Sequence, residues 1–284
     1  MTTAELLVHG WHWKPEVLAG CIALAGAYLV ATGFRPGRGL LFWTSGSLVL
    51  LVSLVSPIDT LSHHYLFSAH MLQHLLLVLI VPPLLLLGLP GQTMHRLLRR
   101  PLAARIERML RQPVVGWGLA TGAMWVWHLP SLYGAALASD GVHVLQHLVF
   151  LVTATIFWWP LLAPLPDRRF AAPVAVVYLF AAMAAASVLG IVLTFAAPGL
   201  YPAYLSPEDE HGILPLIRDG WGLTPAVDQQ AGGLLMWVPS NAIYLWALIA
   251  TLVRWFNAPE DTAAGASRPV EVHEAPLLAN QGRK

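Results

Sequence analysis

The chain carries little charge. Asp, Glu, Lys and Arg make up 11% of its 284 residues, whereas hydrophobic residues make up 57%. An ordinary soluble domain has about 25% charged residues, so this composition excludes a typical soluble globule and indicates a protein that crosses a membrane several times. The formal net charge of +1 gives no basis for a nucleic-acid partner, and we predict none. The lipid bilayer is the partner that the composition predicts.

Cysteine is almost absent. Cys21, which lies in an apolar run, is the sole cysteine, so the chain has no disulfide framework and no Cys-x-x-Cys metal clip. The sequence also lacks a recognisable nucleophile–base set and a nucleotide-binding loop. We therefore expect a protein that is not an enzyme, and any metal site must be built from other side chains.

Seven stretches are apolar enough to cross a bilayer, which takes about 20 residues as helix. The third contains Pro82-Pro83, which should kink it, and the fourth is rich in glycine. The predicted fold class is all-α, a polytopic membrane bundle of seven transmembrane helices within residues 15–256. The expected helices are 15–34, 39–57, 65–89, 113–129, 142–163, 171–197 and 230–256. The flanking parts are predicted to be an outer N-terminal segment (1–14) and a disordered cytoplasmic tail (257–284), because the tail is rich in Ala, Pro and charge.

The basic residues orient the bundle. Segment 91–112 holds six arginines, which is a strong cytoplasmic signature because loops rich in Lys and Arg stay inside. With seven crossings, 14 of the 16 Lys and Arg residues fall on that side, and only Lys14 and Arg218 fall outside. We therefore predict that the N-terminus is outside and the C-terminus is cytoplasmic.

The sequence His-x-Leu-Gln-His-Leu occurs twice. His70 and His74 form one pair, and His143 and His147 form the other, 73 residues later. Residues four apart on a helix lie on one face, and both expected helices enter the membrane from the outer side. We interpret the repeat, together with a proline that precedes each copy at the same distance, as a duplicated unit whose histidine pairs face a common space.

Paired imidazoles of this kind are typical of metal sites. Neutral imidazole suits copper, zinc and iron, and thioether sulfur favours Cu(I). Ionisable side chains within a membrane span are functional candidates, because burying them in lipid is costly. The alternative is that these histidines only satisfy polar groups across helices. His128, in a Trp-His-Leu-Pro motif, falls at the same outer end, and Met71, Met124 and Met236 lie at similar depth.

Six motifs, taken in their order and spacing, are more specific than any one of them alone. They are Ser68-Ala-His-Met-Leu-Gln-His, Trp127-His-Leu-Pro-Ser-Leu-Tyr, His143-Val-Leu-Gln-His, Phe157-Trp-Trp-Pro, Tyr201-Pro-Ala-Tyr and Asp228-Gln-Gln-Ala-Gly-Gly-Leu-Leu-Met-Trp. Between about residues 39 and 255 the chain thereby resembles the bacterial seven-helix cytochrome c oxidase assembly factor family of the CtaG type, which is associated with caa-type oxidases.

The resemblance implies a multi-pass protein of the bacterial inner (plasma) membrane that helps a haem-copper oxidase mature, by helping copper reach its centre. It implies cytochrome c oxidase subunits and a periplasmic copper chaperone as partners. Copper is the expected metal, with haem or zinc as the alternative. The positions that match the family's motifs, and that we expect to be the metal ligands, are His70, His74, His128, His143, His147 and Asp228.

Two other functions stay open on the sequence alone. A haem protein would ligate iron with one histidine from each pair and would show a Soret band. A copper or proton transporter would need a polar path that continues inward, and below the histidine pairs only Thr153 and Thr155 are polar, which argues against transport. The sequence does not assign roles to His63, His64 and His211, or to the outer segment 198–227, for which a lid, a docking site and a solvated acidic turn are all open readings.

Overall fold

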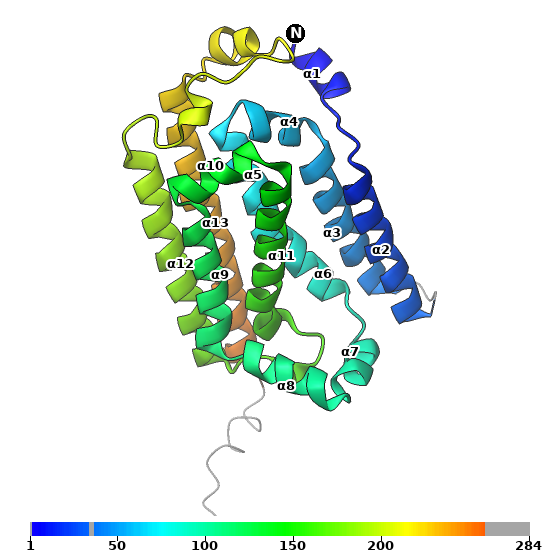
Figure 1. Cartoon of the computed structure of the whole chain (residues 1–284). Helices are drawn as coiled ribbons and strands as arrows, with labels where there is room; N and C mark the ends of the chain where they lie inside the picture. The colour runs from blue at the N-terminus through cyan, green and yellow to red at the C-terminus, as the bar shows by residue number, and fades with distance from the viewer. Residues whose placement is uncertain (1, 34–36, 259–284) are drawn as a thin grey trace, which may run out of the picture.

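The computed structural model describes residues 2–33 and 37–258, and all the regular structure in those ranges is helical, with no strand. The long helices lie side by side in one bundle (Figure 1). The α-helices are α1 (Thr3–His9), α2 (Pro15–Thr32), α3 (Arg38–Val55), α4 (Pro57–His64), α5 (Phe67–Leu75), α6 (Val81–Gly88), α7 (Gly91–Leu98), α8 (Pro101–Leu110), α9 (Pro113–Trp127), α10 (Pro130–Ala138), α11 (Asp140–Leu162), α12 (Ala172–Phe195) and α13 (Pro225–Phe256). Two π-helical turns, η1 (Leu76–Ile80) and η4 (Leu216–Gly220), and two 3₁₀ turns, η2 (Pro166–Arg168) and η3 (Pro202–Tyr204), lie between them.

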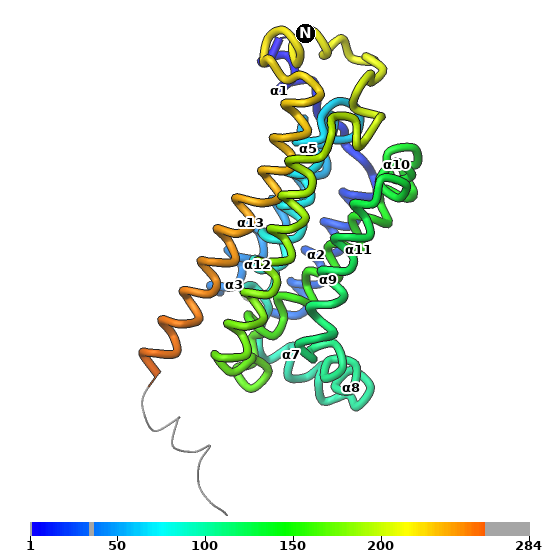
Figure 2. The backbone as a smooth tube through the Cα atoms, turned by 90° about the vertical axis from the view of Figure 1, so that its left-hand side faces the viewer, coloured from blue at the N-terminus to red at the C-terminus, as the bar shows by residue number. Residues whose placement is uncertain are grey.

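Six of the helical stretches in the described ranges are long and apolar enough to span a membrane. They are Pro15–Thr32, Arg38–Val55, Phe67–Gly88, Asp140–Leu162, Ala172–Phe195 and Pro225–Phe256. The fourth expected span is helical too, but α9 has 15 residues and is therefore about 22 Å long, short of the ~30 Å hydrocarbon core. It nevertheless runs along α11 and α12, from α8 at one end of the bundle to α10 near the other (Figures 1 and 2).

The segment that joins the second and third expected spans is mostly helix. Ser56 caps α4 by accepting a hydrogen bond from the Ile58 backbone N–H, and Pro57 takes the first helical position, where its missing N–H costs nothing. Pro130 starts α10 in the same way. Each proline of the repeated unit thus begins a short helix that precedes the histidine-bearing helix, α5 or α11.

The third span is wound irregularly, as its two prolines predict. Pro82 has no N–H to donate to the carbonyl of Val78, and the helix widens into the π-turn η1 just before it. The indole Nε1–H of Trp158, on α11, donates to that Val78 carbonyl at 3.0 Å. A side chain from a neighbouring helix therefore satisfies the backbone group that the proline leaves free.

Two glycines let α13 approach its neighbours closely. A Cβ added at Gly232 would lie 2.3 Å from the ring of Phe67, and one at Gly233 would lie 2.5 Å from the Thr194 backbone. Side chains larger than hydrogen do not fit at either position. The Gly-Gly step of the Asp228 motif thus packs α13 against α5 on one side and α12 on the other, which fixes where the start of α5 lies.

The two ends of the bundle differ in charge and in histidine content. One end, called here the α4 end, carries α1, α4, α10 and segment 196–224, whereas α7 and α8 lie at the other end (Figures 1 and 2). The arginines of segment 91–112 lie on or next to α7 and α8, while the histidine pairs lie toward the α4 end. This separation matches the one on which the predicted orientation rests.

Large apolar side chains cover much of the outside of the bundle. Val114, Phe195, Trp246 and Phe256 are all more than 70% exposed, which a water-soluble protein would rarely tolerate over such an area. The exposed apolar surface and the six apolar spans identify a membrane protein. Apart from Asn257 and Ala258, the predicted disordered tail 257–284 lies outside the described residues.

Candidate metal centre

The two histidine pairs lie together inside the bundle. The ring centroids of His70 and His143 are 5.2 Å apart, and those of His74 and His147 are 5.7 Å apart. His70, His74 and His147 each offer a ring nitrogen, and these three atoms lie within 4.8 Å of one another. Because two imidazole nitrogens on one ion lie at most about 4 Å apart, side-chain adjustments of about an ångström bring the three onto one ion.

These imidazoles carry buried nitrogens that bond to nothing in the described chain. His70 Nε2, both ring nitrogens of His74, and Nε2 of His143 and of His147 have no hydrogen-bond partner there. A buried polar atom without a partner usually costs about 1–3 kcal/mol, and here several converge on one space. The donor set therefore fits a metal ion that imidazole prefers.

The orientation of His70 comes from its other nitrogen. Nδ1 lies 3.3 Å from the backbone carbonyl of Ser62 and 3.3 Å from the hydroxyl of Tyr204, which itself donates to the same carbonyl at 2.8 Å. If Nδ1–H donates to Ser62, the lone pair is on Nε2, which faces the other histidines. Metal-binding histidines are commonly held by such a bond to a carbonyl.

His143 continues the group toward the α4 end. Its Nδ1 lies 3.0 Å from Nδ1 of His63, so one imidazole donates to the other. Burial lowers the pKa of His63 and also that of His64, and the carboxylates of Asp140 and Glu210 oppose these shifts only in part. Both imidazoles are therefore neutral at pH 7. The sequence pointed to His63 only through its place outside the membrane.

His128 lies at the edge of the cluster, with its ring centroid 5.7 Å from that of His74. Its Nδ1 is 2.6 Å from the Met124 carbonyl, which can only accept, so Nδ1 carries the proton. In the neutral ring Nε2 is then an acceptor, and it faces the Met71 sulfur at 3.4 Å. Two lone pairs thus face each other in a buried place. The sequence indicated only that Met71 lies at a similar depth, and the structure places its sulfur against His128.

Tyrosines from two segments cover the centre at the α4 end. Tyr133, on α10, packs its ring 4.9 Å from that of His70, and its hydroxyl pairs with that of Tyr204. Tyr201 donates to the backbone carbonyl of His128 at 2.8 Å. Segment 196–224, which supplies Tyr201 and Tyr204, therefore packs over the histidines. Because Tyr201 lies 73 residues from His128 along the chain and Tyr204 lies 134 residues from His70, no local sequence pattern predicts these contacts.

A polar network supports the centre beside α5. The Gln73 amide donates to the Ser53 carbonyl and to Asp59, and its oxygen accepts from Ser62. Asp59 in turn pairs with Lys14 at 2.6 Å. Gln73 thus locks α4 onto α5, and with it the Ser62 carbonyl that orients His70.

Asp228, on α13, uses its carboxylate to bind the first residues of α5. Its carboxylate accepts from the backbone N–H groups of Phe67 and Ser68, at 2.7 and 3.0 Å, and from the Ser68 hydroxyl. The first N–H groups of a helix lack partners within it, and a negative charge at this end also interacts favourably with the helix dipole. The carboxylate therefore fixes the helix that carries His70 and His74, and it lies outside the three-histidine group.

Replacing Asp228 by Ala should lower the free energy of unfolding by about 1–3 kcal/mol, because the buried N–H group of Phe67 and the part-buried N–H group of Ser68 lose their acceptor. Asp219→Ala, an exposed carboxylate near the same end, serves as the control and should change stability by less than about 0.5 kcal/mol. Thermal unfolding of the purified variants measures this. An unchanged melting temperature together with loss of bound metal would instead identify Asp228 as a ligand.

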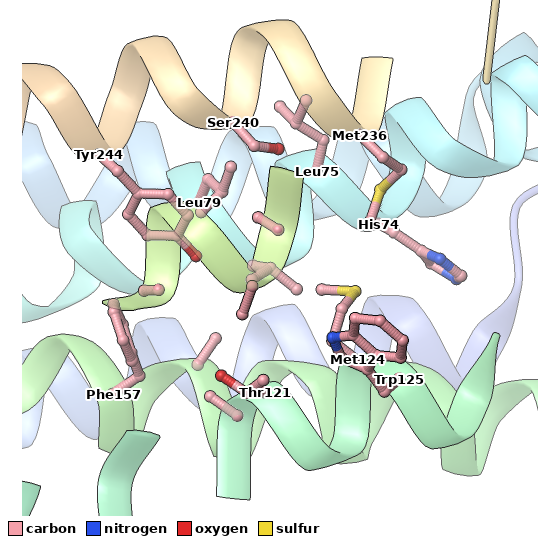
Figure 3. A pocket seen from close by; sticks show the side chains of 16 residues that line it. His74, Leu75, Leu79, Thr121, Met124, Trp125, Phe157, Met236, Ser240 and Tyr244 are labelled. Atoms are coloured by element: carbon pink, nitrogen blue, oxygen red, sulfur yellow. The ribbon is translucent and has the colours of Figure 1, made fainter. Parts of the chain in front are cut away.

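A small cavity extends from His74 between α9 and α13. It has a volume of about 50 Å³. Figure 3 shows His74 at one end and Tyr244 at the other, with Met124 and Met236 reaching in from facing helices. Two thioethers therefore lie beside an imidazole whose nitrogens have no partner in the described chain.

A second cavity borders the other histidine pair. It has a volume of about 440 Å³ between α2 and α11, with His143 and His147 on one wall. Cys21 and several leucines make much of the remaining wall apolar, and Lys14, Glu16 and Asp59 also line the cavity. The histidine centre is thus flanked by space on two sides.

The family model described as cytochrome c oxidase caa3 assembly factor matches residues 23–258. The chain belongs to this family. The matched residues include both histidine pairs, His128 and Asp228. No solved structure matches the chain significantly.

Three curated proteins from mycobacteria are similar to the chain at low sequence identity. Uncharacterised proteins of Mycobacterium bovis and Mycobacterium tuberculosis are each 23% identical to the chain over 281 residues, and one of Mycobacterium leprae is equally similar. Each alignment covers 90% of this chain and 41% of the relative. The chain thus spans about two fifths of the length of these relatives, whose names assign them no activity.

Proposed function

We propose that this assembly factor binds copper at the histidine centre and helps mature the metal centre of the oxidase. The observation that carries the proposal is the convergence of His70, His74 and His147 with buried nitrogens that have no partner in the described chain. His143 and His128 border them. Neutral imidazoles gathered in this way are ligands for copper, zinc or iron.

The pairing of His128 with Met71 favours copper among these metals. Zinc sites use Cys, His, Asp and Glu, whereas thioether sulfur is a soft ligand that selects Cu(I). Because the proton of His128 is held by the Met124 carbonyl, Nε2 and the Met71 sulfur present two lone pairs to the same place. A Cu(I) ion there would use both lone pairs.

The residues around the histidine centre suit a protein that holds and delivers a copper ion better than one that conducts the ion across the membrane. Phe150 packs its ring 4.7 Å from that of His74, on the side toward the end of the bundle that carries α7 and α8. Beyond it lies an apolar cluster that includes Ala154, Phe157 and Trp158. Beyond His74 the thioethers of Met124 and Met236 line a cavity of only about 50 Å³, and no further histidine of the described chain lines it. This small space supports an assembly factor over a transporter.

The proposed setting is the bacterial inner membrane with the α4 end outside, and the bundle crossing it seven times with α9 as the fourth span. The N-terminus then lies outside and the C-terminus in the cytoplasm. The proposed partners are cytochrome c oxidase subunits and a periplasmic copper chaperone, which meet the protein at the α4 end. The charge asymmetry between the two ends supports this orientation.

Reporter fusions test the orientation. A reporter that is active only in the periplasm should be active when it is joined after Asp140, and a reporter active only in the cytoplasm should be active after Arg100. The opposite pattern at either junction would overturn the orientation, the seven-span count or both. The two junctions lie on either side of α9, so they face opposite sides of the membrane only if α9 crosses it.

Cells that lack this chain test the function. They should accumulate oxidase polypeptides with little copper, while cells that also carry the wild-type chain should make metallated oxidase. Copper per oxidase in isolated membranes, measured with the amount of oxidase subunits held constant, is the readout. Normal copper content in the oxidase of the deficient cells would contradict the proposal.

A further inference from the structure

A line of histidines leads from the surface of the α4 end to the buried centre. His64 and His63 have ring centroids 4.7 Å apart, His63 and His143 are 4.8 Å apart, and His143 and His70 are 5.2 Å apart. His211 extends the line outward, at 6.2 Å from His64. Each imidazole therefore lies next to another one along the whole way in.

Exposure falls steadily along this line. His211 and His64 are exposed, His63 is half-buried, and His143 and His70 are buried. The residues come from segment 196–224, α4, α11 and α5 in turn, so no single helix repeat places them in a row. The arrangement joins solvent to the centre by one kind of ligand.

The central step has the spacing of a metal transfer. His63 Nδ1 and His143 Nδ1 are 3.0 Å apart, and two imidazole nitrogens that share one ion lie at most about 4 Å apart. An ion held by His63 can therefore gain His143 as a ligand before it leaves His63. The line of histidines ends at His74, where Phe150 packs against the ring and the thioethers of Met124 and Met236 line the neighbouring cavity.

We propose that His211, His64 and His63 form a loading relay that passes Cu(I) from the outer surface to His143 and then to the three-histidine centre. This inference rests on the proposed function, because it requires that the centre binds copper. The relay sets how fast the centre fills and not how tightly it holds the ion. Within residues 2–33 and 37–258, His63 is the histidine that joins the exposed His64 to His143, so the relay depends most on this residue.

The test follows Cu(I) transfer to the purified full-length protein from a colorimetric Cu(I) chelator, by stopped-flow absorbance. His63→Gln should slow loading about tenfold or more, which is ~1.4 kcal/mol of barrier, while copper content at equilibrium stays at the wild-type level. His63→Met should restore fast loading, because thioether binds Cu(I). His9→Gln, an exposed histidine outside the line, should load like the wild type.

His64→Gln and His211→Gln lie at the exposed end and should slow loading less than His63→Gln. Wild-type loading rates in His63→Gln would overturn the relay while leaving the copper centre in place. A lower equilibrium copper content in His63→Gln would overturn it too, by making His63 a ligand of the centre, and so would a failure of His63→Met to restore the rate. A wild-type protein that takes up no copper would overturn the proposed function itself.

Discussion

Replacing both histidines of either pair by glutamine should abolish the bound metal and the maturation of the oxidase. The two variants are His70→Gln with His74→Gln, and His143→Gln with His147→Gln. Glutamine preserves hydrogen bonding but is a poor ligand for copper or zinc. If the histidines only satisfied polar groups across helices, the change would be small, because such bonds in membranes average about 0.6 kcal/mol.

The readouts are copper per purified chain and copper per oxidase in the membranes. Protein level in the membrane fraction shows whether each variant is still inserted. His95→Gln, on α7 at the opposite end of the bundle, is the matched control and should leave both copper values unchanged. Wild-type amounts of mature oxidase from both double variants would count decisively against a metal site.

Replacing Met71 by leucine should weaken Cu(I) binding by about tenfold to a hundredfold, the range that losing a partner around a metal site commonly costs. Leucine conserves the volume of this buried side chain, so the fold should be kept while the sulfur that faces His128 is lost. Zn²⁺ binding should change little, because zinc does not prefer thioether.

Competition with chelators of known affinity measures both metals in the same preparation. Met109→Leu, on α8 and exposed, is the control and should bind Cu(I) as the wild type does. Equal losses of Cu(I) and Zn²⁺ affinity in Met71→Leu would mean that the leucine disturbs packing, and unchanged Cu(I) affinity would remove Met71 from the site.

The meeting of the two histidine pairs was predictable from the sequence. The i, i+4 spacing places each histidine pair on one helix face, and the repeat implies that α5 and α11 present those faces at one depth. Six of the membrane spans follow from hydropathy. The short length of α9 could not be predicted from hydropathy, because the apolar run continues to Leu129 whereas the helix ends at Trp127.

Contacts between distant segments were not predictable. Asp228 lies 160 residues from Ser68 along the chain, and its motif gave no sign that its partner is the start of α5. The sequence left two roles equally open for Gln73, a bond to the histidines or a bond between helices, and the structure shows the second, with Ser53, Asp59 and Ser62 as its partners. Periodicity describes relations within one helix, whereas these roles depend on how helices pack against one another.

The copper content of the purified wild-type chain is the most direct test of the metal centre. The protein is loaded with excess Cu(I), washed with a weak chelator and analysed for metals, beside the two double histidine variants. The wild type should retain about one copper ion per chain or more, and both variants should retain almost none. Equally little copper in the folded wild type and in the variants, or retention of zinc or haem in place of copper, would contradict the account.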